Sequence, residues 1–182
     1  MSKRALIVVD IQNDYFPGGR WTLDGMEQAG SNAAAVIGAA RAAGDRVIFI
    51  AHEFESADAP FFAPGTDGAR LHKVLGAGPD DTVIVKHEVN AFKGTDLNAV
   101  LQRDGIEDVT IVGAMSHMCI DAATRAAADL GYKVTLVHDA CATRALEFAG
   151  KIVPAAEAHA AFMSALGFAY ATLVSTADYV KA

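Results

Sequence analysis

Short runs rich in β-branched residues alternate along this chain with alanine-rich segments. The runs are continuously apolar, as in strands that are buried on both faces of a sheet, and they lie at 5–9, 47–51, 82–85, 109–112, 134–137 and 171–174. The alanine-rich segments have helical spacing and are each followed by a glycine at the expected helix end; they lie at 31–43, 95–103, 117–130 and 154–166. This order predicts a three-layer α/β/α sandwich, with a mostly parallel, doubly wound sheet of about six strands between helices.

Composition limits the classes of protein to which the chain can belong. Its 182 residues predict a single domain, 1–182, with a core of its own. A net charge of −7, without a run of Lys or Arg, argues against nucleic-acid and membrane-surface partners. The first apolar run ends at Asp10, too early for a signal-peptide core, so we expect a soluble, cytoplasmic protein. Two cysteines make no disulfide framework, which leaves a thiol available for chemistry.

One long segment, 53–79, interrupts the alternation. It is rich in proline and glycine and carries Phe54, Phe61 and Phe62. Loops of this length in compact domains are often lids or interface elements. The other interpretation is a plain surface excursion, which leaves three phenylalanines without an obvious place to pack.

Chemically capable side chains follow the predicted strands. In an open parallel sheet, ligands bind beyond the carboxyl ends of the strands. The predicted strands end at Asp10, His52, Lys86, Gly113 and His138–Asp139, and Cys119 follows the fourth of them. A carboxylate, an amine and a thiol are therefore expected along one edge of the sheet.

These three side chains suit nucleophilic catalysis. A helix N-terminus and the Lys86 ammonium would both favour the Cys119 thiolate, and Asp10 would act as general base. Backbone N–H groups of the 113–119 turn would stabilise an oxyanion. Each residue also has a plain structural interpretation, since Asp10 can cap a turn, Lys86 can be a solvated strand end, and Cys119 can be a small core residue.

Other candidates support narrower expectations. The histidines at 52, 87, 117 and 138 match no familiar metal motif, so the sequence predicts neither a metal site nor a cofactor. His117 is expected either to line the pocket or to cap the helix, and Cys141, past the fifth strand, to be structural. Phe16, Trp21 and Phe54 are candidates for the wall of a small apolar pocket, with packing under the long loop as the alternative. Nucleotide-binding glycine motifs are absent from the sequence.

Several blocks of sequence closely resemble the isochorismatase-like cysteine hydrolases. In order, they are VVDIQNDYF (8–16), VK (85–86), NAF (90–92), TDL (95–97), VGAMSHMCI (112–120), ATRAA (123–127), GY (131–132) and HDA (138–140). The resemblance implies a catalytic triad of Asp10, Lys86 and Cys119 that works through a thioester. It also implies a cis peptide between Ala114 and Met115, and an oxyanion hole formed by the N–H groups of Met115 and Cys119.

The resemblance also narrows the chemistry. Ether-cleaving isochorismatases lack the cysteine, so Cys119 favours hydrolysis of a C–N bond in an amide, lactam or ureido compound. Nicotinamidases carry an Asp-x-His metal arrangement after the second strand, whereas this chain has AHEFE at 51–55. We therefore expect an amidohydrolase acting on a small molecule, and a homo-oligomer, either a dimer or a tetramer. The alternatives are an ether hydrolase and a non-catalytic small-ligand binding module on the same fold.

Overall fold

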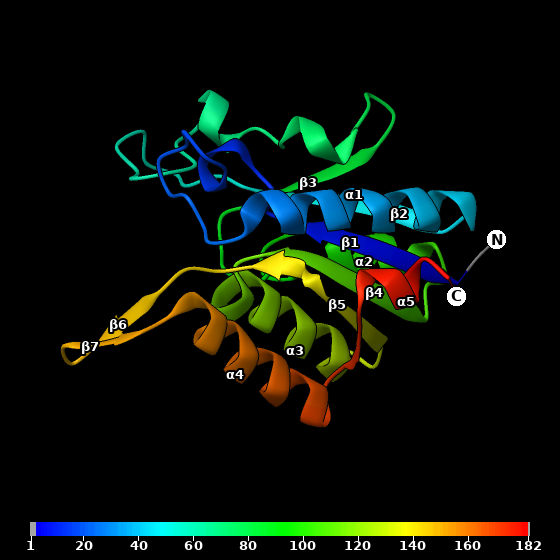
Figure 1. The fold of residues 1–182 in the computed structure, drawn as a ribbon. Coiled ribbons are helices and arrows are strands. Elements are labelled where there is room, and N and C mark those ends of the chain that lie inside the picture. Colours follow the sequence, from blue (N-terminus) through cyan, green and yellow to red (C-terminus); the bar gives the residue numbers. More distant parts are fainter. Residues whose placement is uncertain (1–2, 182) are drawn as a thin grey trace.

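A six-stranded parallel sheet forms the centre of the molecule (Figure 1). The computed structural model describes residues 3–181, so Met1, Ser2 and Ala182 of the predicted domain lie outside the described residues. The strands are β1 (Arg4–Val9), β2 (Arg46–His52), β3 (Thr82–Lys86), β4 (Asp108–Ala114), β5 (Lys133–Ala142) and β8 (Thr172–Val174). They lie in the order β3-β2-β1-β4-β5-β8, which confirms the predicted fold class.

Helices cover both faces of the sheet (Figure 1). Helices α1 (Met26–Ala42) and α5 (Thr176–Tyr179) pack with one apolar cluster, and α2 (Leu97–Arg103), α3 (Asp121–Asp129) and α4 (Ala155–Ala169) with the other. Strand β1 shows why its sequence is continuously apolar: Leu6 and Val8 join the first cluster, whereas Ile7 and Val9 join the second. Among the described residues, none of the helices is both long and apolar enough to cross a membrane.

Three local features differ from the predicted elements. Strand β5 continues to Ala142, so His138, Asp139 and Cys141 lie within it rather than at or beyond its end. Helix α3 begins only at Asp121, because the residues before it form a π-helical turn, η4 (Ser116–Ile120). A two-stranded antiparallel hairpin, β6 (Leu146–Phe148) and β7 (Lys151–Val153), projects from the body of the molecule (Figure 1). Its strands are too short to show a period in the sequence.

The long segment 53–79 is held against the core. It contains two short 3₁₀ turns, η2 (Asp67–Ala69) and η3 (Lys73–Leu75), and a third, η1 (Asn13–Tyr15), lies beneath it. Gln12 Nε2 donates to the carbonyl of Ala69 at 2.6 Å, and the Phe62 N–H donates to Asp14 Oδ2 at 2.7 Å. Phe62 is buried, and Phe54 and Phe61 pack on the same core cluster. The three phenylalanines of the loop thus pack against the core, and the loop is anchored to it.

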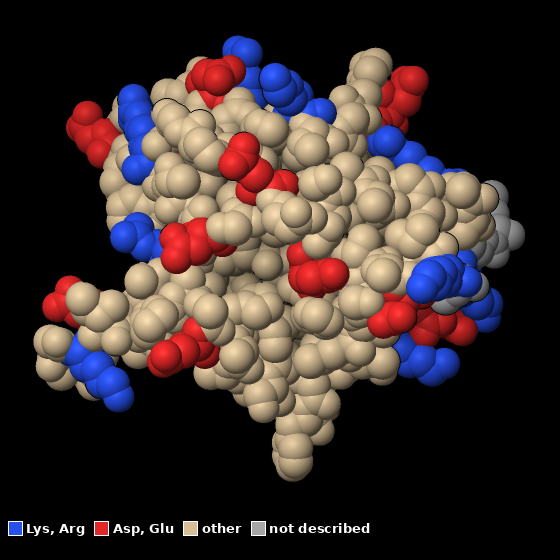
Figure 2. Space-filling view, viewed as in Figure 1, with Lys and Arg blue, Asp and Glu red and all other residues tan. Residues whose placement is uncertain are grey.

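The charged side chains are dispersed. On the face drawn in Figure 2, acidic and basic groups are interspersed over apolar and neutral surface, and Lys and Arg do not gather into one area. On this face the described residues form no basic patch.

Candidate active site

Four side chains from separate elements meet at the carboxyl edge of the sheet. Asp10 follows β1, His52 ends β2, and Lys86 ends β3 in register with His52. Cys119 lies in the π-helical turn that follows β4. Asp10 has a φ of 53°, in the left-handed region that non-glycine residues seldom adopt, and such backbone strain concentrates at functional sites.

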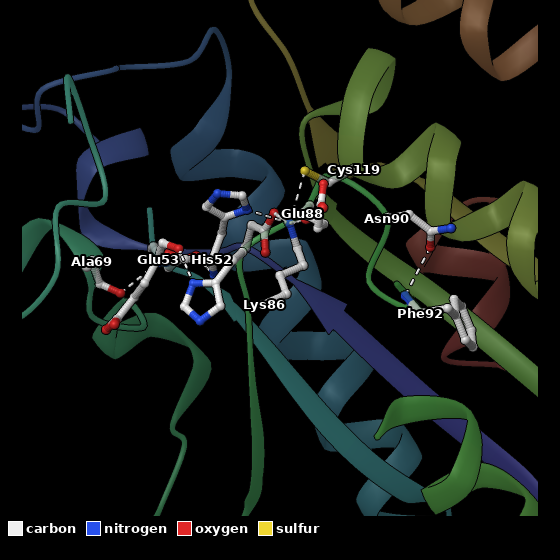
Figure 3. A network of polar contacts seen from close by, with 11 residues as sticks. His52, Glu53, Ala69, Lys86, Glu88, Asn90, Phe92 and Cys119 are labelled. Atoms are coloured by element: carbon white, nitrogen blue, oxygen red, sulfur yellow. Dashed lines mark hydrogen bonds and ion pairs between the residues drawn. The ribbon is translucent and has the colours of Figure 1, made fainter. Parts of the chain in front are cut away.

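The Lys86 ammonium is the centre of this cluster (Figure 3). Its Nζ lies 2.8 Å from Asp10 Oδ2, 2.8 Å from His52 Nδ1 and 3.3 Å from Cys119 Sγ. It also donates to the carbonyl oxygen of Glu88 at 3.1 Å. The structure therefore brings together Asp10, Lys86 and Cys119, the three residues that the sequence places at one edge.

All of these groups are withdrawn from water. Asp10 and Lys86 are fully buried, and Cys119 is 5% exposed. Burying an ion pair is costly unless the charges are well compensated. The Asp10 oxygens have no hydrogen-bond donor among the described residues apart from Lys86 and the Cys119 thiol. The carboxylate therefore keeps lone pairs free beside the sulfur, as a general base requires.

Burial and the neighbouring charges shift the pKa values of Asp10, Lys86 and Cys119. Burial raises the pKa of the Cys119 thiol, and the Asp10 carboxylate adds to this effect, which Lys86 only partly offsets. Burial also raises the pKa of Asp10, against the effect of Lys86. Burial alone would lower the pKa of Lys86, but Asp10 and Cys119 outweigh it, so the net shift is upward. Burial and the Asp10 carboxylate thus oppose ionisation of the Cys119 thiol, and the Lys86 ammonium favours it.

The turn that carries the sulfur has two notable backbone features. The peptide bond between Ala114 and Met115 is cis, as the resemblance implies. The N–H groups of Met118 and Ile120 both donate to the Met115 carbonyl. Those two donors are therefore occupied. They do not include the N–H groups of Met115 and Cys119, to which the resemblance assigns the oxyanion hole.

The predicted pocket residues do not form one group. Phe54 packs edge-on against His52, with ring centroids 4.6 Å apart, and Phe61 links Phe54 to Trp21. Phe16 instead stacks on His72 at 3.6 Å, on the side of helix α1, so it belongs to the core. Phe54 thus contacts His52 of the cluster directly, and Trp21 is connected to it through Phe61 and Phe54.

His117 does not cap a helix. The residue that precedes the π-helical turn is Met115, and His117 lies within the turn. Its Nδ1 makes a 2.6 Å hydrogen bond with Thr143 Oγ1. This contact connects the turn to the residue after β5.

Cys141 lies within β5 and is buried. Its Sγ makes a 3.4 Å contact with the Val137 carbonyl.

Three of the clustered side chains have the donor types of a metal site. Ligand atoms of Asp10, His52 and Cys119 lie within 4.8 Å of one another, the one such group found among residues 3–181. Lys86 Nζ, however, contacts all three residues. The ammonium occupies the position that a cation would take, so this donor set does not fit a metal ion. His87 Nδ1 donates a hydrogen bond to the carbonyl oxygen of Glu53 at 2.6 Å.

The contact between His52 and Lys86 is a feature of the cluster that the sequence does not reveal. Its position at the end of a predicted strand places His52 at the carboxyl edge of the sheet. Its contact with Lys86, however, depends on the pairing of β2 with β3. The register places His52 directly opposite Lys86. Pairing of two particular parallel strands is not encoded in either strand alone, so only the order of the sheet exposes this contact.

Comparison with known proteins identifies the class. The isochorismatase domain matches residues 4–178, so the chain belongs to the isochorismatase family of hydrolases. It is 46% identical over 177 residues to the isochorismatase family protein YddQ of Bacillus subtilis, covering 97% of this chain and 98% of YddQ. It is 34% identical over 167 residues to a streptothricin hydrolase of Streptomyces noursei, covering 90% of this chain and 59% of that protein.

Solved structures agree with this assignment. A crystal structure from Oleispira antarctica, described as an isochorismatase hydrolase, superposes with a TM-score of 0.95 at 49% identity, covering 98% of this chain and 96% of that one. The N-carbamoylsarcosine amidase of Thermoplasma acidophilum superposes with a TM-score of 0.81 at 24% identity, covering 96% of this chain and 97% of that one, which shows a shared fold.

Proposed function

We propose that this protein is a cysteine hydrolase that cleaves a C–N bond of a small amide, lactam or ureido compound. The observation that carries the proposal is a thiol sulfur 3.3 Å from a buried lysine that is itself paired with a buried carboxylate at 2.8 Å. The names of two family relatives, streptothricin hydrolase and ureidoacrylate amidohydrolase, support a hydrolase of this kind.

The first half of the reaction forms a thioester. Asp10 takes the proton of the Cys119 thiol, and the sulfur attacks the carbonyl carbon. The Lys86 ammonium compensates the charge of the sulfur as the proton leaves, and the N–H groups of Met115 and Cys119 donate to the oxyanion. Collapse of this intermediate breaks the C–N bond, and Asp10 gives its proton to the leaving nitrogen.

The second half restores the enzyme. A water molecule gives a proton to Asp10 as its oxygen attacks the thioester carbon, and collapse of the second intermediate expels the Cys119 thiolate. The thiolate then recovers the proton from Asp10. The sum is one amide and one water converted to one carboxylic acid and one amine or ammonia. Phe54 and Trp21 would bound the substrate.

Two further properties belong to this proposal. Both cysteines are free thiols, which suits a reducing compartment such as the cytoplasm. We also expect the protein to be a homo-oligomer, either a dimer or a tetramer.

Substitution of the nucleophile tests the proposed function. C119A is expected to lower ammonia or amine release from a panel of small amides and ureido compounds by at least about 10³-fold, because the covalent route is lost. C141A, which removes the other buried thiol, is the matched control and should retain activity. A C119A protein as active as wild type would refute the cysteine mechanism. Activity lost in D10N but kept in C119A would instead indicate attack by water, as in an ether hydrolase.

A further inference from the structure

A buried histidine contacts the lysine of the proposed triad. His52 Nδ1 lies 2.8 Å from Lys86 Nζ, as close as the Asp10 carboxylate lies to that nitrogen. We propose that His52 is a positioning residue of the active site, whose Nδ1 accepts a hydrogen bond from the Lys86 ammonium and holds it between Asp10 and Cys119. This inference rests on the proposed function and adds a fourth member to its machinery.

The chemistry of the two groups fixes the direction of this hydrogen bond. An ammonium has three N–H donors and no lone pair, so it can only donate. His52 Nδ1 must therefore be bare, and the neutral ring carries its proton on Nε2. Burial, together with the charges of Lys86 and His87, lowers the pKa of His52 to about 4, which agrees with a neutral ring. The Nε2 atom is buried and has no hydrogen-bond partner among the described residues.

Both the backbone and the ring of His52 are held in place. The backbone N–H of His52 donates to Gln12 Oε1 at 2.8 Å, and Gln12 Nε2 donates to the backbone carbonyl of His52 at 2.8 Å. The ring packs edge-on against Phe54, and the side chain is only 6% exposed. The acceptor is therefore presented to Lys86 by a fixed side chain, as Figure 3 shows.

Counting donors shows what this acceptor does. The three shortest contacts of Lys86 Nζ are with Asp10, His52 and the Glu88 carbonyl, and they match its three N–H donors. These acceptors orient the ammonium, while its charge remains 3.3 Å from the Cys119 sulfur. Without the His52 acceptor, the buried ammonium loses one of its two 2.8 Å contacts and, among the described residues, its one hydrogen bond to β2.

Three variants of one position separate the functions of the two ring nitrogens. H52N places an amide oxygen near the position of Nδ1, so it keeps an acceptor for Lys86. H52Q places its amide group near the position of Nε2 and leaves no acceptor near Lys86. H52L removes both. We expect H52L and H52Q to lower kcat by about 10- to 100-fold with KM nearly unchanged, and H52N to recover most of the loss.

A substrate-independent measurement accompanies the kinetics. The rate at which iodoacetamide alkylates Cys119, followed by mass spectrometry, reports how well the thiolate is stabilised. It should fall about tenfold in H52L and H52Q and stay within about twofold of wild type in H52N. These variants keep the nucleophile, so a failure of C119A to abolish activity would refute the proposed function without bearing on their alkylation rates.

The tautomer of the ring can be observed directly in the unmutated protein. ¹⁵N NMR of the histidine-labelled protein at neutral pH should show His52 as a neutral ring protonated on Nε2. A ring protonated on Nδ1, full alkylation and turnover in H52L, or recovery by H52Q rather than H52N would each overturn the proposal. The last result would assign His52 to substrate binding through Nε2. Because the NMR measurement needs no substitution, it holds even if a variant fails to fold.

Discussion

The Asp10–Lys86 pair carries two opposite charges in a part of the molecule from which water is excluded. Both side chains have no exposed surface, and their 2.8 Å contact compensates the cost of burying each charge. Such a pair contributes little net stability, but removal of one partner leaves the other uncompensated. The Asp10–Lys86 pair therefore does not explain the stability of the fold, since the desolvation of its two charges offsets most of their attraction.

Removal of the lysine alone should destabilise the protein. We expect K86M to lower the free energy of unfolding by about 3–5 kcal/mol, because the Asp10 carboxylate stays buried without its partner or must take up a proton. The double variant D10N/K86M removes both charges and should recover to within about 2 kcal/mol of wild type. Urea unfolding of the three proteins measures this difference. Equal losses in the single and double variants would show that the pair is not coupled.

The pH dependence of stability should contain a contribution from His52. Its pKa is lowered from 6.5 to about 4 in the folded protein. Between these values the unfolded chain binds a proton at this position and the folded protein does not, so stability falls as pH falls, by up to about 1.4 kcal/mol per pH unit. Above the higher value both states are neutral, and the contribution is constant.

Comparison with H52N isolates that contribution from other groups. H52N has no ring to titrate, so its free energy of unfolding should fall less than that of wild type between about pH 6.5 and about pH 4.5. Urea unfolding across this range gives the difference between the two proteins. A difference that does not change with pH would show that His52 titrates normally in the folded state.

The site residues could be predicted from the sequence where they lie at the ends of predicted strands. Asp10 and Lys86 directly follow or end continuously apolar runs, and Cys119 follows another, so their shared edge could be derived from the pattern. The pattern could not show that burial and Asp10 raise the pKa of the Cys119 thiol by more than Lys86 lowers it. For Phe16 the sequence left a pocket wall and packing under the long loop as alternatives, and its ring stacks on His72 of that loop within the core cluster.

At the scale of elements, β1 and β4 approach each other closely at Gly113. Gly113 pairs with Val9, has a φ of 130°, and leaves no room for a side chain: a Cβ there would lie 1.9 Å from the Val9 carbonyl oxygen. This approach brings the strand before the Cys119 turn against the strand that ends at Asp10. Glycine at this position thus helps to set the distance between Asp10 and Cys119.

A pair of glycine substitutions tests this packing. G113A should lower the free energy of unfolding by at least about 3 kcal/mol, because both the φ angle and the Val9 backbone oppose a Cβ. G38A is the matched control: Gly38 lies in α1 with nothing within 4 Å of a Cβ, so alanine should stabilise by about 0.5–1 kcal/mol. Thermal melting measures both changes. A G113A protein that melts with wild type would contradict the assigned packing.

Long apolar and alanine-rich segments predicted most elements, because each buries a face that only one type of structure satisfies. Short or irregular elements were missed for the same reason. The hairpin strands β6 and β7 have three residues each and bury little, so no period marks them. The extension of β5 to Ala142 includes a register shift against β4, which an apolar pattern does not signal.

At the scale of the whole molecule, the order of the sheet explains where the site lies. The chain builds β1, β2 and β3 in one direction and then returns to place β4 on the other side of β1. Ligands of doubly wound sheets bind at such a reversal. Asp10 follows β1 and Cys119 follows β4, so these two residues flank the reversal. The alternation of segments predicted a parallel sheet, but the position of this reversal came only with the strand order.

The molecule also exposes large apolar side chains away from the site, and these bear on its association. Phe148 and Ile152 on the hairpin are 84% and 67% exposed, and Phe168 near the end of α4 is 92% exposed. A two-stranded hairpin is at best marginally stable alone in water, and burial of such side chains against a second copy would stabilise it.

We therefore expect sedimentation equilibrium near pH 7.5, about two units from the pI, to give a multiple of the 19.0 kDa chain mass. F148S/I152S should shift the mass toward 19.0 kDa while circular dichroism stays unchanged. F168S tests the end of α4 in the same way, so the two variants distinguish the hairpin from the helix as the contact. A wild-type protein that sediments as a single chain at every concentration would refute the expected oligomer.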